Sequence, residues 1–155
     1  MTAQATREQP SAMVSIRRAT PADAGAIESL VRDAELVLPG VSEHLRSFLI
    51  AERQERPVGA IGLELRGPSA LLRSAVVTPD ARGRGIGGAL FDAVLELAQA
   101  EGVETLYLLT TTTEGYWSRR GFARVARDEV PVDVRESAEF VGACPASAAA
   151  MRRAV

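Results

Sequence analysis

The chain has 155 residues, of which 46% are hydrophobic and 25% are charged, and its formal net charge is -2 at pH 7. This length and balance predict one globular domain, over residues 14–155, after a polar and flexible tail at residues 1–13. A slightly acidic chain argues against broad nucleic-acid binding, because nucleic acids require a basic face. No apolar run has membrane-spanning length, and the single cysteine, Cys144, excludes an internal disulfide. We therefore expect a cytoplasmic protein without nucleic-acid or membrane partners.

The first part of the domain is predicted to combine strands with short helices. Residues Val14–Arg18 indicate a first strand, and Thr20 followed by Pro21 indicates the cap and the first position of a helix. Apolar residues with helical spacing extend this helix until Leu38-Pro39-Gly40 breaks it. The elements expected next are a short helix at residues 42–48 and three strands, at residues 49–52, 58–65 and 71–77.

The second part contains the longest predicted helix, at residues 85–100. Its apolar residues recur on one face and its polar residues on the other, as in a helix that packs against a core. The aliphatic strand that follows, at residues 103–109, is typical of the middle of a sheet. The last expected elements are a helix at residues 114–120, a strand at 122–127, a helix at 131–140 and a strand at 148–155.

A loop rich in glycine and arginine lies between the strand at residues 71–77 and the long helix. Its glycines let the backbone pass close to a ligand and direct successive N–H groups into one concavity. The helix that follows presents its positive end to the same place, and Arg82 and Arg84 add charges suited to phosphate. The loop therefore predicts a binding site for a diphosphate.

Other interpretations of this loop are weaker. Residues 83–88 fit G-x-G-x-x-G, the dinucleotide fingerprint, but residues 78–82 separate them from the strand end, and no series of βαβ units surrounds them. A P-loop is excluded, because the chain contains no lysine. A glycine-rich turn with solvated arginines remains the plain alternative.

The pattern Arg82-x-x-Gly85-x-Gly87, after a strand that ends in Val-Thr-Pro, resembles the pyrophosphate loop of the GNAT superfamily of acetyl-CoA-dependent N-acetyltransferases. The order of predicted elements over residues 14–155 agrees with this resemblance. It implies an α+β GNAT fold, with a mixed central sheet of about six or seven strands flanked by about four helices. It also implies acetyl-CoA as cosubstrate and no metal. The residues implied for cofactor binding are Ala75, Val76, Val77, Arg82, Gly83, Arg84, Gly85, Ile86, Gly87 and Gly88.

Motifs in the rest of the chain narrow the resemblance. They comprise residues 62–64, 71–74, 106–112, 117–122, 139–140 and 144–148. These motifs look like those of the arsenic-resistance-associated N-acetyltransferases and, more distantly, of the acetyltransferase domain of N-acetylglutamate synthases. The likeness implies acetylation of the free α-amino group of a small amino acid, or of an amino-acid-like arsenical or phosphinic compound.

The chain departs from the family pattern at the residues that usually supply the acid and the base. Many GNAT enzymes carry a tyrosine where this chain has Trp117, and Tyr116 lies one residue earlier, about 100° around a helix. Many also carry a glutamate base where this chain has Leu71. The remaining candidates are Glu64, as a base acting through water, and Tyr116, as an acid. The alternatives are an exposed strand carboxylate or an internal ion pair for Glu64, and a partly buried packing tyrosine for Tyr116. We therefore expect catalysis mainly by positioning of the amine, with backbone N–H groups stabilising the oxyanion.

Several side chains are candidates for substrate binding. Arg73 would suit a substrate carboxylate or oxyanion, and its alternative is an internal ion pair with Glu64. Ser147 matches a serine that contacts the substrate carboxylate in the glutamate-acetylating relatives. Residues 128–147 are expected to close the substrate side into a pocket. The full set of candidates is Arg73, Ser74, Thr110, Thr111 and Ser147.

Two further hypotheses stay open at this point. The first is acetylation of protein N-termini, which would require an open groove in place of a pocket. The second is a catalytically weak domain that binds acetyl-CoA as a sensor or structural ligand. We expect the acceptor to be a small-molecule amine, the sequence leaves a homodimer open, and the isolated His44 predicts no metal site.

Overall fold

A computed structural model describes residues 14–155, so the predicted tail lies outside the described part. The described strands form one seven-stranded sheet in the order β1-β2-β3-β4-β5-β7-β6. Neighbouring strands are antiparallel, except that β4 and β5 run parallel. The predicted mixed sheet is therefore confirmed. The strands are β1 (Val14–Arg18), β2 (Phe48–Arg53), β3 (Arg56–Arg66), β4 (Ser69–Val77), β5 (Thr105–Thr110), β6 (Ala123–Val125) and β7 (Ala149–Ala154).

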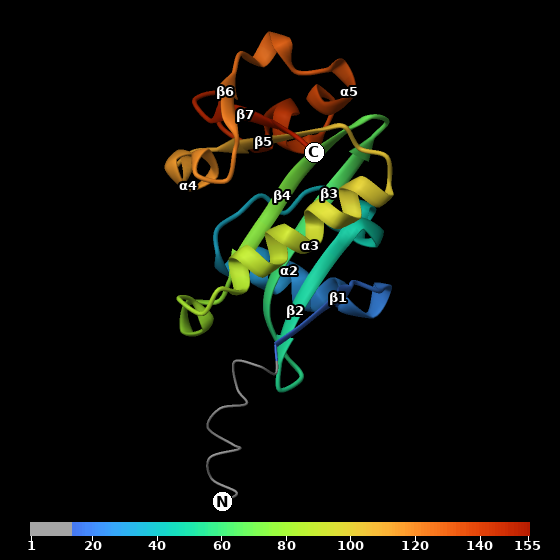
Figure 1. The fold of residues 1–155 in the computed structure, drawn as a ribbon, viewed down its shortest axis with the longest axis vertical. Coiled ribbons are helices and arrows are strands. Elements are labelled where there is room, and N and C mark those ends of the chain that lie inside the picture. Colours follow the sequence, from blue (N-terminus) through green and yellow to red (C-terminus); the bar gives the residue numbers. More distant parts are fainter. Residues whose placement is uncertain (1–13) are drawn as a thin grey trace, which may run out of the picture.

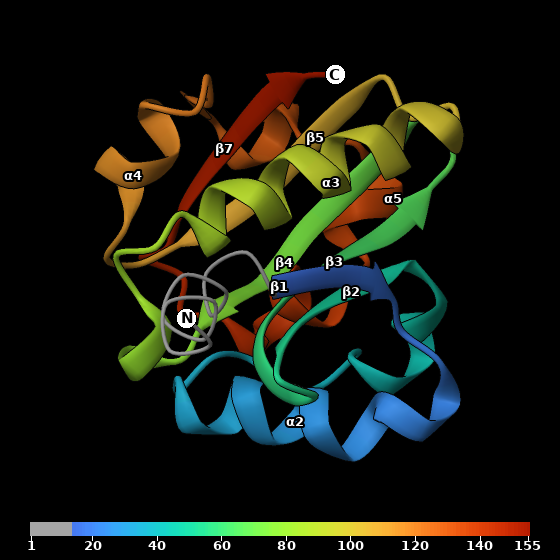
Figure 2. The same ribbon diagram turned by 60° about the horizontal axis from the view of Figure 1, so that its bottom comes forward.

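Helices cover both faces of this sheet. The two longer ones are α2, on one face, and α3, which crosses the other face over β2, β3 and β4 (Figures 1 and 2). No helix within residues 14–155 is long and apolar enough to cross a membrane. The α-helices are α2 (Ala24–Asp33), α3 (Ile86–Ala100), α4 (Glu114–Ser118) and α5 (Val132–Arg135). Single turns of 3₁₀ helix occur at Pro21–Asp23, Pro79–Ala81 and Arg127–Glu129, and a longer one at Ser42–Ser47.

The helix expected at residues 131–140 is a wrong prediction. The structure has the four-residue helix α5 and then a separate π-helical turn at Glu139–Ala143. Ser137 lies between them, fully buried, and its hydroxyl accepts a 3.4 Å hydrogen bond from the N–H of Phe140. A serine side chain that bonds to the nearby backbone in this way competes with continued helix formation.

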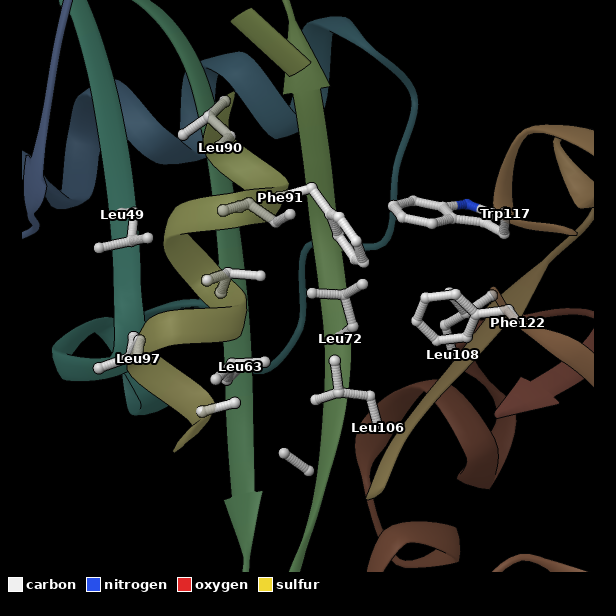
Figure 3. Close-up of a cluster of buried hydrophobic side chains, with 14 of the residues drawn as sticks. Leu49, Leu63, Leu72, Leu90, Phe91, Leu97, Leu106, Leu108, Trp117 and Phe122 are labelled. Atoms are coloured by element: carbon white, nitrogen blue, oxygen red, sulfur yellow. The ribbon is translucent and has the colours of Figure 1, made fainter. Parts of the chain in front are cut away.

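The largest core cluster lies between α3 and the sheet and extends to α4. Figure 3 shows Phe91 of α3 pointing toward Trp117 and Phe122, with Leu72 and Leu108 of the sheet beside them. The ring centroids of Phe91 and Trp117 are 5.9 Å apart, and those of Trp117 and Phe122 are 5.6 Å apart. Offset aromatic contacts of this kind add to the hydrophobic stabilisation of a core. Trp117 therefore holds α4 against α3.

The two central strands separate partway along their length. β4 and β5 pair only from Ser69 and Thr105 to Leu71 and Tyr107, although both strands continue beyond these residues. The pairing of β3 with β4 also shifts register near Ser74, which has a left-handed φ of 58°. Such a bulge bends a strand and changes the direction of its N–H groups and side chains. A cleft opens where the strands diverge.

Candidate active site

The cleft between the diverging strands has a volume of about 1000 Å³. One end is lined by β4, by the glycine loop and by the first turn of α3. A second part, near Arg73 of β4, is lined by the loop after α2 and by residues of the Glu139–Ala143 turn with the two residues that follow it. The cleft therefore has a loop end and a wall end, with the open edge of β4 joining them. We call residues 139–148 the wall.

The glycine loop leaves open space at the loop end. Gly83 and Gly85 have left-handed φ angles of 79° and 81°, and a Cβ built on either would have no protein atom within 4 Å. Gly85 is also the N-cap residue of α3, and the first N–H groups of that helix have no intrahelical partner. Uncovered N–H groups at the positive end of a helix suit a phosphate. The local geometry therefore fits the diphosphate of coenzyme A.

The candidate cofactor residues divide into two groups by position. All but one of them line the cleft, and the exception is Arg84, which is exposed outside the lining. Arg82 donates a 3.0 Å hydrogen bond from Nε to the carbonyl of Val77, which holds the loop against the end of β4. Their binding roles stay predictions.

Tyr116 and Trp117 point in different directions, as neighbouring residues of a helix must. Trp117 is in the core, whereas half-buried Tyr116 lines the cleft at the loop end. A Cβ built on Gly87 would lie 3.2 Å from the Tyr116 hydroxyl, so that hydroxyl lies over the first turn of α3. The guanidinium of Arg120 stacks on the tyrosine ring, with 4.2 Å between Cζ and the ring centroid. Tyr116 is thus held in place beside the site where the cofactor would enter.

Arg73 does not have the free guanidinium that a substrate anion would need. Its side chain is fully buried, and its Nη1 donates a 2.6 Å hydrogen bond to Oε2 of Glu64. The same guanidinium donates to the carbonyls of Val37 and Pro39, at 2.7 and 2.8 Å, and to the Ser74 hydroxyl, at 3.1 Å. The internal ion pair, which was the alternative, is what the structure contains. We therefore interpret Arg73 as a residue that ties the loop after α2 to β4, in place of the substrate role that we expected.

Glu64 is likewise poorly placed for the role of a base. It is 1% exposed and is not among the residues that line the cleft. Arg73 occupies its Oε2, while Arg66 donates to Oε1 at 2.7 Å and Nε2 of His44 lies 3.4 Å from the same oxygen. Both oxygens of the Glu64 carboxylate are therefore already engaged by protein donors, away from the residues that line the cleft. His44 therefore does not stand alone, as the sequence suggested, but belongs to this buried cluster.

The remaining substrate candidates have mixed positions. Ser74, Thr110 and Thr111 line the cleft, whereas Ser147 is exposed and lies outside its lining. The Thr110 hydroxyl is 2.7 Å from the hydroxyl of Thr113 and accepts a 3.0 Å hydrogen bond from the Thr113 N–H. Such a contact is ordinary turn chemistry at the end of a strand. No contact of these residues with a substrate is tested, so their binding roles stay predictions.

Glu139 is the site residue that sequence reasoning missed. It is 6% exposed, it lines the wall end of the cleft, and its Oε2 lies 3.6 Å from Nε of Arg73. Burial raises the pKa of its carboxyl from 4.5 to about 7; the nearby Glu64 adds to this rise, and Arg73 and Cys144 oppose it. Burial, followed by the charge of Glu139, also raises the pKa of the Cys144 thiol to about 11, so Cys144 stays protonated. Glu139 was noticed only as part of a family motif, because the sequence does not indicate which strand it faces.

The part of the chain that the structure describes contains no group of three or more histidine, cysteine, aspartate or glutamate side chains that could hold a metal ion. The polar groups that line the cleft include backbone N–H groups, hydroxyls and one buried carboxyl. Such an arrangement suits transfer of an acyl group held by a diphosphate-containing carrier.

Comparison with known proteins agrees with this interpretation. The family described as "Acetyltransferase (GNAT) family" matches residues 11–125. The "Amino-acid acetyltransferase" of Mycobacterium tuberculosis is 30% identical over 129 residues, which cover 77% of this chain and 74% of that protein. The "Amino-acid acetyltransferase" of Neisseria meningitidis serogroup A is 29% identical over 77% of this chain but only 30% of its own length. This chain therefore spans less than a third of that longer relative.

A solved structure shows the same fold with ligands bound. N-acetylglutamate synthase from Neisseria gonorrhoeae, complexed with coenzyme A and N-acetyl-glutamate, has a TM-score of 0.79 and 25% identity to this chain. The similarity covers 91% of this chain and 35% of that one. Because the family match covers most of the described residues and the fold agrees, this chain belongs to the acetyltransferase (GNAT) family.

Proposed function

We propose that this acetyltransferase moves the acetyl group of acetyl-CoA to the α-amino group of a small amino acid or an amino-acid-like compound. The observation that carries the proposal is the wall, of which five residues line the cleft beside β4: Glu139, Ala143, Cys144, Pro145 and Ala148. A segment that borders the cleft in this way favours a small acceptor over a protein N-terminus, which would need an open groove. Two relatives carry the name "Amino-acid acetyltransferase", which supports the same substrate class.

The chemistry proposed at this site is direct attack of the amine nitrogen on the thioester carbon. The N–H groups near the bulge of β4, at residues 75–77, would face the oxygen on which negative charge develops. One well-placed donor of this kind is worth roughly 3–4 kcal/mol of transition-state stabilisation. Holding the amine about 3–3.5 Å from the carbonyl carbon supplies a further share of the rate.

The experiment that tests the proposal is release of free thiol from acetyl-CoA with a panel of acceptors. The panel contains L-glutamate and other amino acids, phosphinothricin and arsinothricin, each beside its decarboxylated amine where one exists. Turnover of amino acids above their decarboxylated partners supports the proposal, and a preference for arsinothricin would extend it to the arsenical class. Turnover of peptide N-termini alone would favour the N-terminal acetyltransferase. Binding of acetyl-CoA without any turnover would favour the sensor. The cytoplasmic location and the homodimer stay predictions.

A further inference from the structure

The wall places one buried carboxyl in the cleft. Two carboxylate side chains, Glu35 and Glu139, line the cleft within the described residues, and Glu35 is exposed to solvent. Glu139 is buried and comes from the π-helical turn at Glu139–Ala143, which positions it against β4. A polar group buried at the surface of a substrate cleft requires a reason, because burial without a strong partner costs stability.

The contacts of Glu139 are weak compared with those of Glu64. Its distance to the guanidinium of Arg73 is 3.6 Å, whereas Glu64 accepts from the same guanidinium at 2.6 Å. Its other oxygen lies 3.8 Å from Sγ of Cys144, a weak donor. Glu139 thus lines the cleft without a short hydrogen bond to another protein group, whereas a structural counter-ion of Arg73 would be expected to lie closer.

We infer that Glu139 is the general base of this acetyltransferase and accepts a proton from the ammonium group of the substrate, either directly or through one water molecule. The inference rests on the proposed function. It supplies the base that is missing at Leu71, but from the C-terminal wall rather than from the strand before the loop.

The proposed acetyl transfer conserves atoms, protons and electrons. The ammonium group gives one proton to the Glu139 carboxylate, which later releases it to solvent. The freed amine forms the new C–N bond, the C–S bond breaks, and the departing sulfur takes the second proton that the nitrogen loses. The products are an N-acetyl compound and free coenzyme A, and no oxidant, reductant or metal is needed.

The electrostatics around Glu139 suit this role. The charged and titratable groups that face it are Arg73 from β4, Glu64 from β3 and Cys144 from its own segment. Burial is the largest influence and sets the pKa of the carboxyl at about 7, near the pH at which a base is most effective.

The test compares Glu139→Gln with the wild type and with Glu136→Gln. The control changes an exposed glutamate three residues earlier in the same segment. The acceptor is L-glutamate or phosphinothricin, whichever the wild type acetylates faster. With this acceptor and acetyl-CoA, we expect Glu139→Gln to lower kcat by roughly 100- to 10,000-fold and Glu136→Gln to change it little. The affinity for acetyl-CoA should be the same in all three proteins.

The pH profile separates a base from a structural residue. In the wild type, kcat/KM should rise with pH and level off above about 7, because the ionised carboxylate then takes the proton from bound ammonium. In Glu139→Gln, the residual rate should keep rising toward the pKa of the amine itself, because only neutral amine can react. Formate added to Glu139→Ala should restore part of the rate, as a small carboxylate can enter the space left.

Distinct outcomes separate this inference from the proposed function. If the wild type acetylates amino acids and Glu139→Gln does so equally fast with the same pH profile, the base assignment is overturned and the proposed function stands. If Glu139→Gln is slow but keeps the wild-type profile and formate has no effect, Glu139 is structural and the inference also fails. If the wild type turns over none of the acceptors, both the proposed function and the base role of Glu139 are wrong.

Discussion

The Glu64 carboxylate accepts a 2.6 Å hydrogen bond from Nη1 of Arg73, and the two side chains are 1% and 0% exposed. The arginine also donates to two carbonyls of the loop that follows α2. A single buried guanidinium therefore joins β3, β4 and that loop, and the loop lines the substrate end of the cleft. The pair sets the shape of the site without offering a free charge to a substrate.

Breaking this pair should destabilise the protein more than it changes catalysis. Arg73→Ala leaves Glu64 with Arg66 and His44, and Glu64→Ala leaves Arg73 with only the more distant Glu139. Because each variant removes the shortest contact of a buried charge, losses of up to about 3–5 kcal/mol in the free energy of unfolding are expected. Urea denaturation measures these losses. Arg66→Ala is the control, because Arg66 donates to the same carboxylate from a more exposed position. If Arg73→Ala keeps wild-type stability and instead raises KM for the acceptor, Arg73 binds substrate after all.

The glycine loop can be tested with two glycines that have the same backbone strain. Gly85 and Gly67 have φ angles of 81° and 66°, and a Cβ on either would meet no protein atom within 4 Å. Alanine at each position should therefore cost a similar amount of stability, on the order of 1 kcal/mol. Gly67 lies in the turn between β3 and β4, outside the cleft lining. Isothermal titration with acetyl-CoA should show a large loss of affinity for Gly85→Ala and little change for Gly67→Ala. Equal affinities of the two variants would mean that the diphosphate does not bind at this loop.

Glu139 should make the stability of the fold depend on pH. Its carboxyl has a pKa of about 7 in the folded chain against 4.5 ordinarily, so the folded state binds this proton more tightly than the unfolded state. Glu139 therefore lowers the free energy of unfolding as pH rises from about 4.5 to about 7, by up to about 3 kcal/mol, and has no such effect below that window.

The glutamine variant isolates this effect. Glu139→Gln should be more stable than the wild type at pH 8, and the difference should vanish by pH 4. Urea denaturation at several pH values measures it, with Glu136→Gln as the surface control. A difference that stays constant with pH would mean that Glu139 does not titrate in this range.

How far the sequence predicts this site depends on how local each feature is. The glycine loop and the start of α3 are contiguous in the chain, so composition and spacing alone suffice to predict a diphosphate site there. The Arg73–Glu64 contact needed only the register of one hairpin, and it was foreseen as an alternative. Glu139 reaches β4 from a segment more than sixty residues away in the sequence, and no local pattern indicates such a contact. The π-helical turn that positions it was mistaken for part of a regular helix, because Pro131 and the polar residues after it also fit one.

Tyr116 tests whether an acid is needed for departure of the thiolate. Its hydroxyl lies over Gly87, at the loop end of the cleft. We expect Tyr116→Phe to change kcat little, because a coenzyme A thiolate leaves readily, while Tyr116→Ala should also weaken acetyl-CoA binding through the lost ring. Steady-state kinetics with both substrates measure this. A hundredfold fall in kcat for Tyr116→Phe would assign the tyrosine the role of the acid.

Arg127 holds the wall in place, and this gives the last prediction. Its Nη2 donates to the carbonyls of Pro145 and Ala148, at 3.1 and 2.9 Å, and its guanidinium lies 5.6 Å from the centre of the Phe140 ring. Arg127 thus contacts the wall near both of its ends. Arg127→Ala removes these contacts but touches neither the glycine loop nor the core cluster under α3.

We expect Arg127→Ala to make residues 139–148 more mobile and to weaken binding of the acceptor but not of acetyl-CoA. Charged hydrogen bonds are worth about 1.5–3 kcal/mol each, and partial exposure of Arg127 reduces this, so a rise in KM of roughly tenfold is expected. Hydrogen exchange should become faster across the wall, acetyl-CoA affinity should not change, and the combination of acetyl-CoA with acceptor should restore protection. Arg124→Ala is the matched control, since Arg124 pairs with Glu114 on the exposed surface. Unchanged KM despite faster exchange in the wall would mean that the acceptor does not contact this segment, and the open groove required for protein N-termini would then be the better description of the site.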